Sequence, residues 1–388
     1  MKRAAVLAVL VAALPTGAQA DDEDYGRGTV IFARGSSLYR VDARGRGETE
    51  VATLGAKTQV RALRTDAKGS VLLVDVGGHW SWLPLDGSTK SPTELPCADG
   101  PASLSEDGLE VLCRAKTGTA SQLVTLKDGS AKPLDIPSSV GARLVGTAAD
   151  RAVVWTDKGG VWSAPTKDVR RRAQLAAEAP LRSFLVSPDG KRAVGVFHDK
   201  VFTSVRTTKP AEVLMSFALD APPEPARRKM IKTGVPIEWA RSGSWVLVQD
   251  GSAACLMMAG GGQYKCWKGY TGASVSTDGR WGLVLGNRDG SKKQTATPGK
   301  GKGEGKSKGK APAPKPEPTP DPDAEPMNEP EAEGGQAAID DVEVAPPTGP
   351  LALYRIRLEG AFNDAPALIV KIVDGAAVWV PGPALPQL

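Results

Sequence analysis

Residues able to carry out catalysis are sparse in this chain of 388 residues. Its two histidines, His79 and His198, lie far apart, and neither has a second histidine four residues away, as a zinc-protease helix requires. The chain also lacks the Gly-x-Ser-x-Gly sequence that presents the nucleophile of α/β-hydrolases. We therefore predict no catalytic residue, no cofactor site and no metal site.

The four cysteines form two pairs that are close in the sequence, Cys97 with Cys113 and Cys255 with Cys266. Separations of 16 and 11 residues match no zinc pattern, and no histidine lies nearby. An even number of cysteines in a secreted chain indicates disulfide bonds. We predict two of them, each closing a short loop across a turn; a cysteine-rich metal site is the competing interpretation.

Most carboxylates that stand out belong to turns. Asp107, Asp189 and Asp278 each precede a glycine, where a side-chain acceptor favours a tight bend, so we assign them a structural role. Asp321 and Asp323, with glutamates nearby, could bind Ca²⁺ loosely. They lack the spaced acceptors and the glycine of an EF-hand, which argues against a specific calcium site.

Tryptophan is the residue best suited to bind a partner here. Nine of the twenty aromatic residues are tryptophans, and we expect most of them to be packed in the core as large spacers. Trp80 and Trp82 alternate in the sequence GHWSWLPLDG and share one face of a predicted strand. Because exposed aromatic side chains are common anchors in interfaces, these two are our candidates for partner binding.

The elements that must position these residues are repeats of a turn followed by an apolar, β-rich run. Anchored at Gly69, Gly108, Asp150, Gly190, Gly243 and Gly279, the copies follow one another at steps of 39, 42, 40, 53 and 36 residues. A repeat of about forty residues is typical of a β-propeller blade of four strands. The sequence thus predicts an all-β protein with one propeller.

Seven blades account for the chain best, with six or eight as alternatives. The first blade begins at Gly28, and the later ones start near Val60, Pro101, Val140, Pro180, Met230 and Gly272. The segment 374–382, DGAAVWVPG, resembles the missing inner strand of the first blade. We therefore expect the C-terminal strand to pair with the N-terminal one, which would close the ring and leave no open seam.

The last blade is interrupted between its second and third strands. Residues 291–349 are first rich in Lys and Gly and then rich in Pro and Glu, with almost no aliphatic residues. Such a segment cannot bury enough apolar surface to offset its ordering entropy, so we predict disorder. It serves either as a passive tether or as an electrostatic arm. The propeller then comprises 21–290 and 350–388.

The first twenty residues have the features of a secretory signal peptide. Lys2 and Arg3 precede an apolar run of eleven residues, and Ala18-Gln19-Ala20 has the small-x-small form of a cleavage site. The run is shorter than the roughly 20 residues that span a bilayer, and no later stretch is apolar enough. Cleavage would reduce the net charge from +5 to +3, which argues against a nucleic-acid ligand.

Several copies of the turn resemble a known propeller repeat. VSPDGKRAVGVF, LSEDGLEVLCRA and VSTDGRWGLVLG are similar to the Ser-Pro-Asp-Gly turn of TolB-type, WD-like bacterial propellers. SLYRVDARG and LALYRIRLEG resemble the companion strand of that repeat. The resemblance covers about Gly28 to Gly382 without the insertion. It implies a periplasmic protein of a Gram-negative bacterium that binds a peptide or protein across one face of the ring.

Three functions are compatible with these features. The first is a periplasmic or secreted, non-enzymatic propeller, monomeric, that binds or scaffolds a protein or peptide of the cell envelope. The second is a propeller enzyme of the lactonase or lyase type with Ca²⁺ at the mouth of the central channel. The third is a structural envelope protein that acts through its charged insertion.

Overall fold

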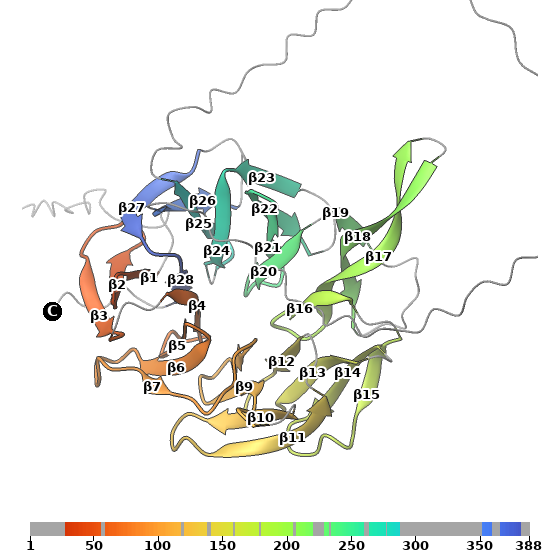
Figure 1. Cartoon of the computed structure of the whole chain (residues 1–388), viewed down its shortest axis with the longest axis horizontal. Coiled ribbons are helices and arrows are strands. Elements are labelled where there is room, and N and C mark those ends of the chain that lie inside the picture. The colour runs from red at the N-terminus through yellow and green to blue at the C-terminus, as the bar shows by residue number, and fades with distance from the viewer. Residues whose placement is uncertain are drawn as a thin grey trace, which may run out of the picture.

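A computed structural model describes residues 28–55, 59–117, 120–137, 141–157, 160–177, 180–204, 207–219, 229–232, 234–259, 264–276, 278–287, 351–358 and 365–381. Within these ranges the chain forms 28 strands in seven antiparallel sheets of four strands each. The sheets are arranged as blades around a common axis, with one strand of each blade innermost (Figure 1). The protein is a seven-bladed β-propeller, as the turn repeat predicts.

The blades are numbered in chain order, and their strands are given from the axis outward. Blade 1 contains β28 (Ala377–Val380), β1 (Thr29–Arg34), β2 (Ser37–Asp42) and β3 (Thr49–Thr53). Blade 2 contains β4 (Val60–Thr65), β5 (Val71–Val76), β6 (His79–Pro84) and β7 (Thr93–Glu94). Blade 3 contains β8 (Ser103–Leu104), β9 (Glu110–Arg114), β10 (Ala120–Thr125) and β11 (Ala131–Pro137). Blade 4 contains β12 (Ala142–Val145), β13 (Ala152–Asp157), β14 (Gly160–Pro165) and β15 (Ala173–Ala176).

The remaining three blades follow the same order. Blade 5 contains β16 (Arg182–Val186), β17 (Arg192–Ser204), β18 (Thr207–Ala218) and β19 (Lys229–Lys232). Blade 6 contains β20 (Val235–Trp239), β21 (Trp245–Asp250), β22 (Ala253–Met258) and β23 (Tyr264–Lys268). Blade 7 contains β24 (Tyr270–Val275), β25 (Trp281–Asn287), β26 (Leu351–Arg357) and β27 (Ala367–Val373).

The two ends of the described chain close the ring inside blade 1. β28 pairs with β1 in antiparallel register from Thr29 opposite Val380 to Phe32 opposite Ala377. This confirms the predicted pairing of the C-terminal strand with the N-terminal one. Because every blade then has a neighbour on both sides, no blade face is left open to solvent at a seam.

The apolar core consists of seven clusters, one between each pair of adjacent blades. The second strand of each blade is buried on both faces, which explains why these strands read as continuous apolar runs. In β1, Val30 and Phe32 pack towards blade 7, whereas Ile31 and Ala33 pack towards blade 2. Six of the nine tryptophans are buried: Trp80, Trp155, Trp239, Trp245, Trp267 and Trp379.

The repeated turn between the first and second strands also joins the blades. Its glycine adopts a positive φ, +69° at Gly69 and +71° at Gly108. A Cβ at Gly69 would lie 2.5 Å from the carbonyl oxygen of Pro381, beyond the closing strand of blade 1. A Cβ at Gly108 would lie 3.1 Å from the side chain of Asp66 in blade 2. Glycine is therefore needed for the backbone conformation and for close approach to the preceding blade.

The long step of 53 residues reflects an extended hairpin in blade 5. β17 and β18 have 13 and 12 residues, and their pairing continues from Arg192 opposite Ala218 to Ser204 opposite Thr207. The pair projects beyond the ring (Figure 1). The extra length displaces the next blade along the sequence. The prediction that blade 6 begins near Met230 is therefore wrong, since that residue lies in β19, the outer strand of blade 5.

Both predicted disulfide bonds are present. Cys97 and Cys113, with Cα atoms 5.8 Å apart, link the connection between blades 2 and 3 to β9. Cys255 and Cys266 lie directly opposite each other on β22 and β23, with Cα atoms 4.0 Å apart. The first bond thus ties the connection between two blades to β9, and the second joins the two outer strands of blade 6.

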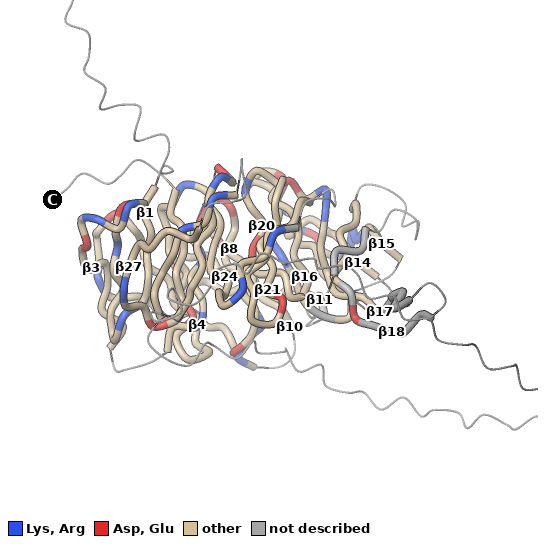
Figure 2. The backbone as a smooth tube through the Cα atoms, turned by 90° about the horizontal axis from the view of Figure 1, so that it is seen from above, with Lys and Arg blue, Asp and Glu red and all other residues tan. Residues whose placement is uncertain are grey.

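The signal peptide and the insertion lie outside the described residues, as do Asp321 and Asp323. The flanks of the insertion are described: Asn287, the last residue of β25, pairs with Leu351, the first residue of β26. The segment between them thus leaves and re-enters blade 7 at the same point. Figure 2 shows the ring from the side, with acidic and basic residues interspersed along it.

Candidate functional site

Trp80 is buried and does not offer a surface to a partner. Its side chain is 2% exposed and packs between blades 2 and 3, and its Nε1 donates a hydrogen bond to the carbonyl of Gly100 at 2.8 Å. The two tryptophans do share one face of β6, but that face is directed towards the core. The structure thus contradicts the prediction that Trp80 is available to bind a partner.

Trp82 is half-buried and lines a groove at the outer side of the same two blades. The groove has a volume of about 690 Å³. Its apolar members are Trp82, Leu95, Pro96 and Leu126, and its charged members are Glu94, Lys116, Lys127 and Asp128. Leu95 and Leu126 are only 2% and 4% exposed, so Trp82 and Pro96 provide most of the accessible apolar surface. Surrounded by both signs of charge, this surface suits a polypeptide segment with one apolar anchor.

Three of the four charged residues in the groove already have partners. Lys116 Nζ lies 2.6 Å from Glu94 Oε1, an ion pair between blades 3 and 2. This contact lowers the pKa of the Glu94 carboxyl. The Asp128 carboxylate accepts a hydrogen bond from the backbone of Ser130 at 2.9 Å. Lys127 makes no hydrogen bond or ion pair with another described residue, although its charge acts on the adjacent Asp128, so its ammonium group can contact an acidic residue of a ligand.

The turn carboxylates have the structural role predicted for them. Ser105 Oγ accepts the backbone N–H of Glu110 at 3.0 Å and donates to Asp107 at 2.7 Å. The same arrangement recurs at Ser187 with Asp189, and at Ser276 with Asp278. All three serine side chains are buried, so each hydroxyl needs the two partners that its turn provides.

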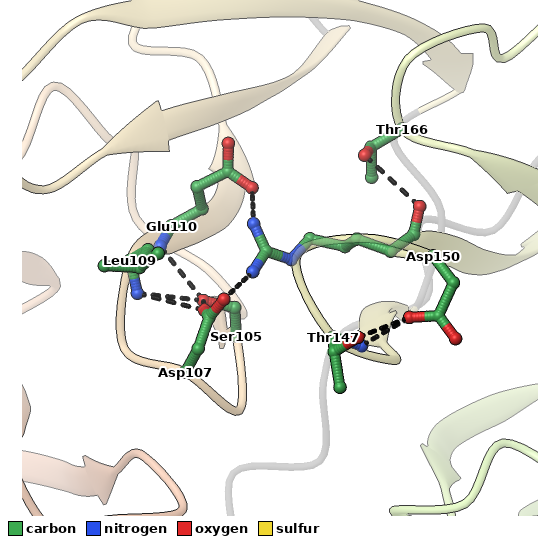
Figure 3. Close-up of polar contacts among 8 residues, drawn as sticks. Ser105, Asp107, Leu109, Glu110, Thr147, Asp150 and Thr166 are labelled. Carbon is green, nitrogen blue, oxygen red and sulfur yellow. Dashed lines mark hydrogen bonds and ion pairs between the residues drawn. The ribbon is translucent and has the colours of Figure 1, made fainter.

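Blade 4 replaces this arrangement with an arginine. Arg151, at the start of β13, directs one guanidinium nitrogen to Asp107 and the other to Glu110, both in blade 3 (Figure 3). Its side chain is only 6% exposed. Burial would raise the pKa of Asp107, but Ser105, the N–H of Leu109 and Arg151 together lower it. The guanidinium group of Arg151 therefore forms two ion pairs that join blade 4 to blade 3.

A second arginine crosses the ring. Arg241 lies in the turn between β20 and β21 of blade 6, and its guanidinium donates to the carbonyls of Thr65 and Asp66 in blade 2, the former at 3.0 Å. Blades 6 and 2 are three positions apart around the ring. Arg241 thus bridges the turns of blades that are not neighbours, at the end of the axis where these turns gather.

Glu238 interacts with Arg241 and with a further buried arginine, Arg64. Glu238 of β20 accepts the N–H of Val275 at 2.8 Å and interacts with the hydroxyl of Ser274. Burial raises the pKa of the Glu238 carboxyl, although Arg64 and Arg241 oppose that effect. The same burial lowers the pKa of Arg64 and Arg241. Surrounding protein desolvates all three groups, as expected at the centre of a ring.

Sequence reasoning missed this central group. The signal was present: Glu238 and Arg64 are charged residues within predicted inner strands, which lie nearest to the axis. The turn that reads Ser-Pro-Asp-Gly in blade 5 reads Ala-Arg-Ser-Gly in blade 6, so Arg241 takes the place of the proline. Charged residues on inner strands and in altered turns are thus informative in propeller sequences.

Among the described residues, no group of three or more His, Cys, Asp or Glu side chains is placed to hold a metal ion. His79 is exposed at the start of β6, and His198 lies in β17. In the same part of the chain, no helix is long and apolar enough to cross a membrane.

Comparison with known proteins places the chain by fold alone. No protein-family profile matches it, and no curated protein matches its sequence. Similar solved structures include TolB from Acinetobacter baumannii, with 14% identity, a TM-score of 0.43, and coverage of 61% of this chain and 62% of that one. A putative TolB from Agrobacterium tumefaciens has 15% identity, a TM-score of 0.40, and coverage of 62% and 88%. Hydrazine synthase of Kuenenia stuttgartiensis has 12% identity, a TM-score of 0.41, and coverage of 58% and 73%. TolB-like propellers are thus among the similar structures, and at these values we draw no functional argument from them.

Proposed function

We propose that this protein is an extracytoplasmic, non-enzymatic propeller that binds a protein or peptide of the cell envelope through the groove around Trp82. The observation that carries this proposal is the groove itself, where the half-buried indole of Trp82 and the ring of Pro96 lie above the buried Leu95 and Leu126 between the outer parts of blades 2 and 3. Buried aromatic anchors of this kind supply a large share of the binding free energy in interfaces.

The location rests on two features of the sequence and one of the structure. Residues 1–20 have the pattern of an exported leader, and the repeat resembles that of periplasmic TolB-type propellers. All four cysteines are paired, which suits an oxidising compartment. We expect the protein to be released with the periplasmic fraction and its cysteines to react with a thiol reagent only after reduction.

Binding is tested with a photoreactive amino acid in place of Thr93, an exposed residue of the groove. We expect a specific crosslinked partner in envelope preparations. Trp82→Ala should reduce the crosslink by about tenfold or more, because it removes the apolar anchor. Trp162→Ala is the matched control, since Trp162 is also half-buried but lies in blade 4 beneath Arg172, 5.0 Å from its guanidinium carbon.

Thermal unfolding of both variants separates binding from stability. The proposal fails if Trp82→Ala leaves the crosslink unchanged in a folded protein. It also fails if the two tryptophan variants lose the crosslink to the same extent, because the loss would then reflect the propeller as a whole.

A further inference from the structure

The outermost strand of blade 7 differs from the other outer strands. Five of the seven outer strands have only two to five residues: β3, β7, β15, β19 and β23. β11 has seven residues, but it includes Pro133 and Pro137, which lack the N–H that an added strand would need. β27 also has seven residues, ALIVKIV, with no proline or glycine. It is therefore a long edge strand in which every residue keeps its N–H, and its protection against pairing is limited to Lys371 and two register shifts against β26.

β27 also exposes apolar side chains. Leu368 is 48% exposed and Ile372 is 44% exposed, and they are two of the four large apolar residues exposed in the described part of the chain. The pairing of β27 with β26 shifts register twice, between Leu351 and Leu353 and again between Leu353 and Tyr354. These bulges account for two large side chains facing solvent on one strand.

The outer side of β27 has no partner strand among the described residues. β27 is the last strand of its sheet, and its ladder pairing is with β26 alone. Both views place it at the rim of the ring (Figure 1, Figure 2). The side chains of Leu368 and Ile372 are thus exposed at the rim, whereas the carbonyl oxygen of Ile369 lies close to Gly45 of blade 1.

The sheet behind this edge is basic. Its four strands contain Arg355, Arg357 and Lys371 and no acidic residue. Lys371 is exposed on β27 itself. The guanidinium carbons of Arg355 and Arg357 lie 4.7 and 5.9 Å from the ring centre of Trp281, so both cations are held on one side of the sheet. Arg355 also donates a hydrogen bond to the carbonyl of Ala43 in blade 1 at 3.0 Å, so the cation at the edge itself is Lys371, which lies on the same strand as the exposed Leu368 and Ile372.

We infer that the edge of β27 is a docking site for an extended, acidic segment of a partner protein, which adds to blade 7 as a further strand. Main-chain pairing would supply part of the affinity, and alternate apolar side chains would pack on Leu368 and Ile372. The positive charge favours an acidic occupant over a second copy of this chain, because two copies would bring like charges together. This surface is separate from the groove at Trp82.

The test uses the full mature chain and a short fluorescent peptide in which Glu or Asp alternates with Val or Ile. A matched peptide has Lys at each acidic position. We expect fluorescence anisotropy to show binding of the acidic peptide and binding weaker by about tenfold or more for the basic one. The double variant Leu368→Thr, Ile372→Thr and the single variant Lys371→Glu should each weaken binding of the acidic peptide. Leu109→Thr, which alters an equally exposed leucine of blade 3, should not.

Three results would overturn the inference. The acidic peptide may fail to bind, or the β27 variants may bind it as well as Leu109→Thr does. Alternatively, sedimentation may show a dimer of the chain that the double variant abolishes, in which case a second copy occupies the edge. Unfolding curves for every variant confirm that the sheet is intact.

Discussion

Single side chains determine how each turn of the propeller is held. In blades 3, 5 and 7 a buried serine hydroxyl organises the turn, and in blade 2 Asp66 does so by accepting the N–H groups of Ser70 and Val71. The turns of blades 4 and 6 lack a serine or aspartate at this place. These are the blades whose arginines, Arg151 and Arg241, reach into other blades. In blade 4 the turn is instead held by Thr147 and Asp150, so a different local bond and a longer-range contact occur together there (Figure 3).

Arg151→Gln should destabilise the protein by about 2 kcal/mol, because it leaves Asp107 and Glu110 partly buried without their common cation. The measurement is chemical unfolding of the wild type and the variant. Arg171→Gln is the control: Arg171 is 82% exposed beside Asp168, and an exposed pair of this kind contributes little. Equal stability of the two variants would contradict a structural role for the two ion pairs of Arg151.

Asp107 should contribute to the acid sensitivity of the fold. Its pKa is lowered in the folded state, so its contribution is present above the unfolded value of about 4 and is lost as the pH falls through the folded value. Asp107→Asn should therefore reduce stability at pH 6 and flatten its decline between about pH 5 and pH 2. Melting temperatures across this range check the prediction. A variant curve parallel to that of the wild type would show that Asp107 does not titrate with folding.

The coupling between Arg241 and Glu238, at the centre of the ring, can also be tested with a single substitution. Arg241→Gln removes the two bonds to blade 2 and one of the cations beside Glu238. Since the pKa of Glu238 is already raised by burial, losing this cation should raise it further. The stability of the variant should then decline, relative to the wild type, as the pH rises through that value. A constant difference between the two proteins from about pH 4 to pH 8 would contradict this coupling.

Strands and hairpins are the next scale, and here the disulfide bonds matter. Cys255–Cys266 joins β22 to the outer strand β23, and the loop it closes spans 11 residues. Replacing both cysteines with alanine should cost about 2 kcal/mol, mainly because the unfolded chain gains freedom. The comparison is the midpoint of denaturant unfolding with and without the pair. Reduction of the wild type breaks both disulfide bonds and should therefore shift the midpoint further than the double alanine variant does, whereas reductant added to the variant should change only the contribution of Cys97–Cys113.

Sequence reasoning reached the ring and its closure because both depend on local patterns. A glycine turn followed by an apolar strand recurs wherever a blade begins, and 374–382 resembles a missing strand. The predicted start of blade 6 near Met230 is wrong because the hairpin of blade 5 is longer than the others, and this extra length leaves the turn motif that marks each blade unchanged. Trp80 was misjudged because alternation tells which side chains share a face and not whether the face meets another blade. The contact of Arg241 with Thr65 joins residues more than a hundred and seventy positions apart. No periodicity could reveal that contact.

The whole molecule depends on its closing strand. β28 supplies Val378 and Val380 to the cluster between blades 1 and 2, and Ala377 and Trp379 to the cluster between blades 7 and 1. Truncation after Asp374 would remove the four residue pairs between β28 and β1 and expose both clusters at once. We expect the truncated chain to lose cooperative unfolding or to be recovered only as aggregate, since open sheet edges promote association. Truncation after Pro381 is the control, because it keeps β28 whole. If the chain ending at Asp374 melts as cooperatively as the control, the ring does not rely on this strand, and the blades must hold together through their neighbours alone.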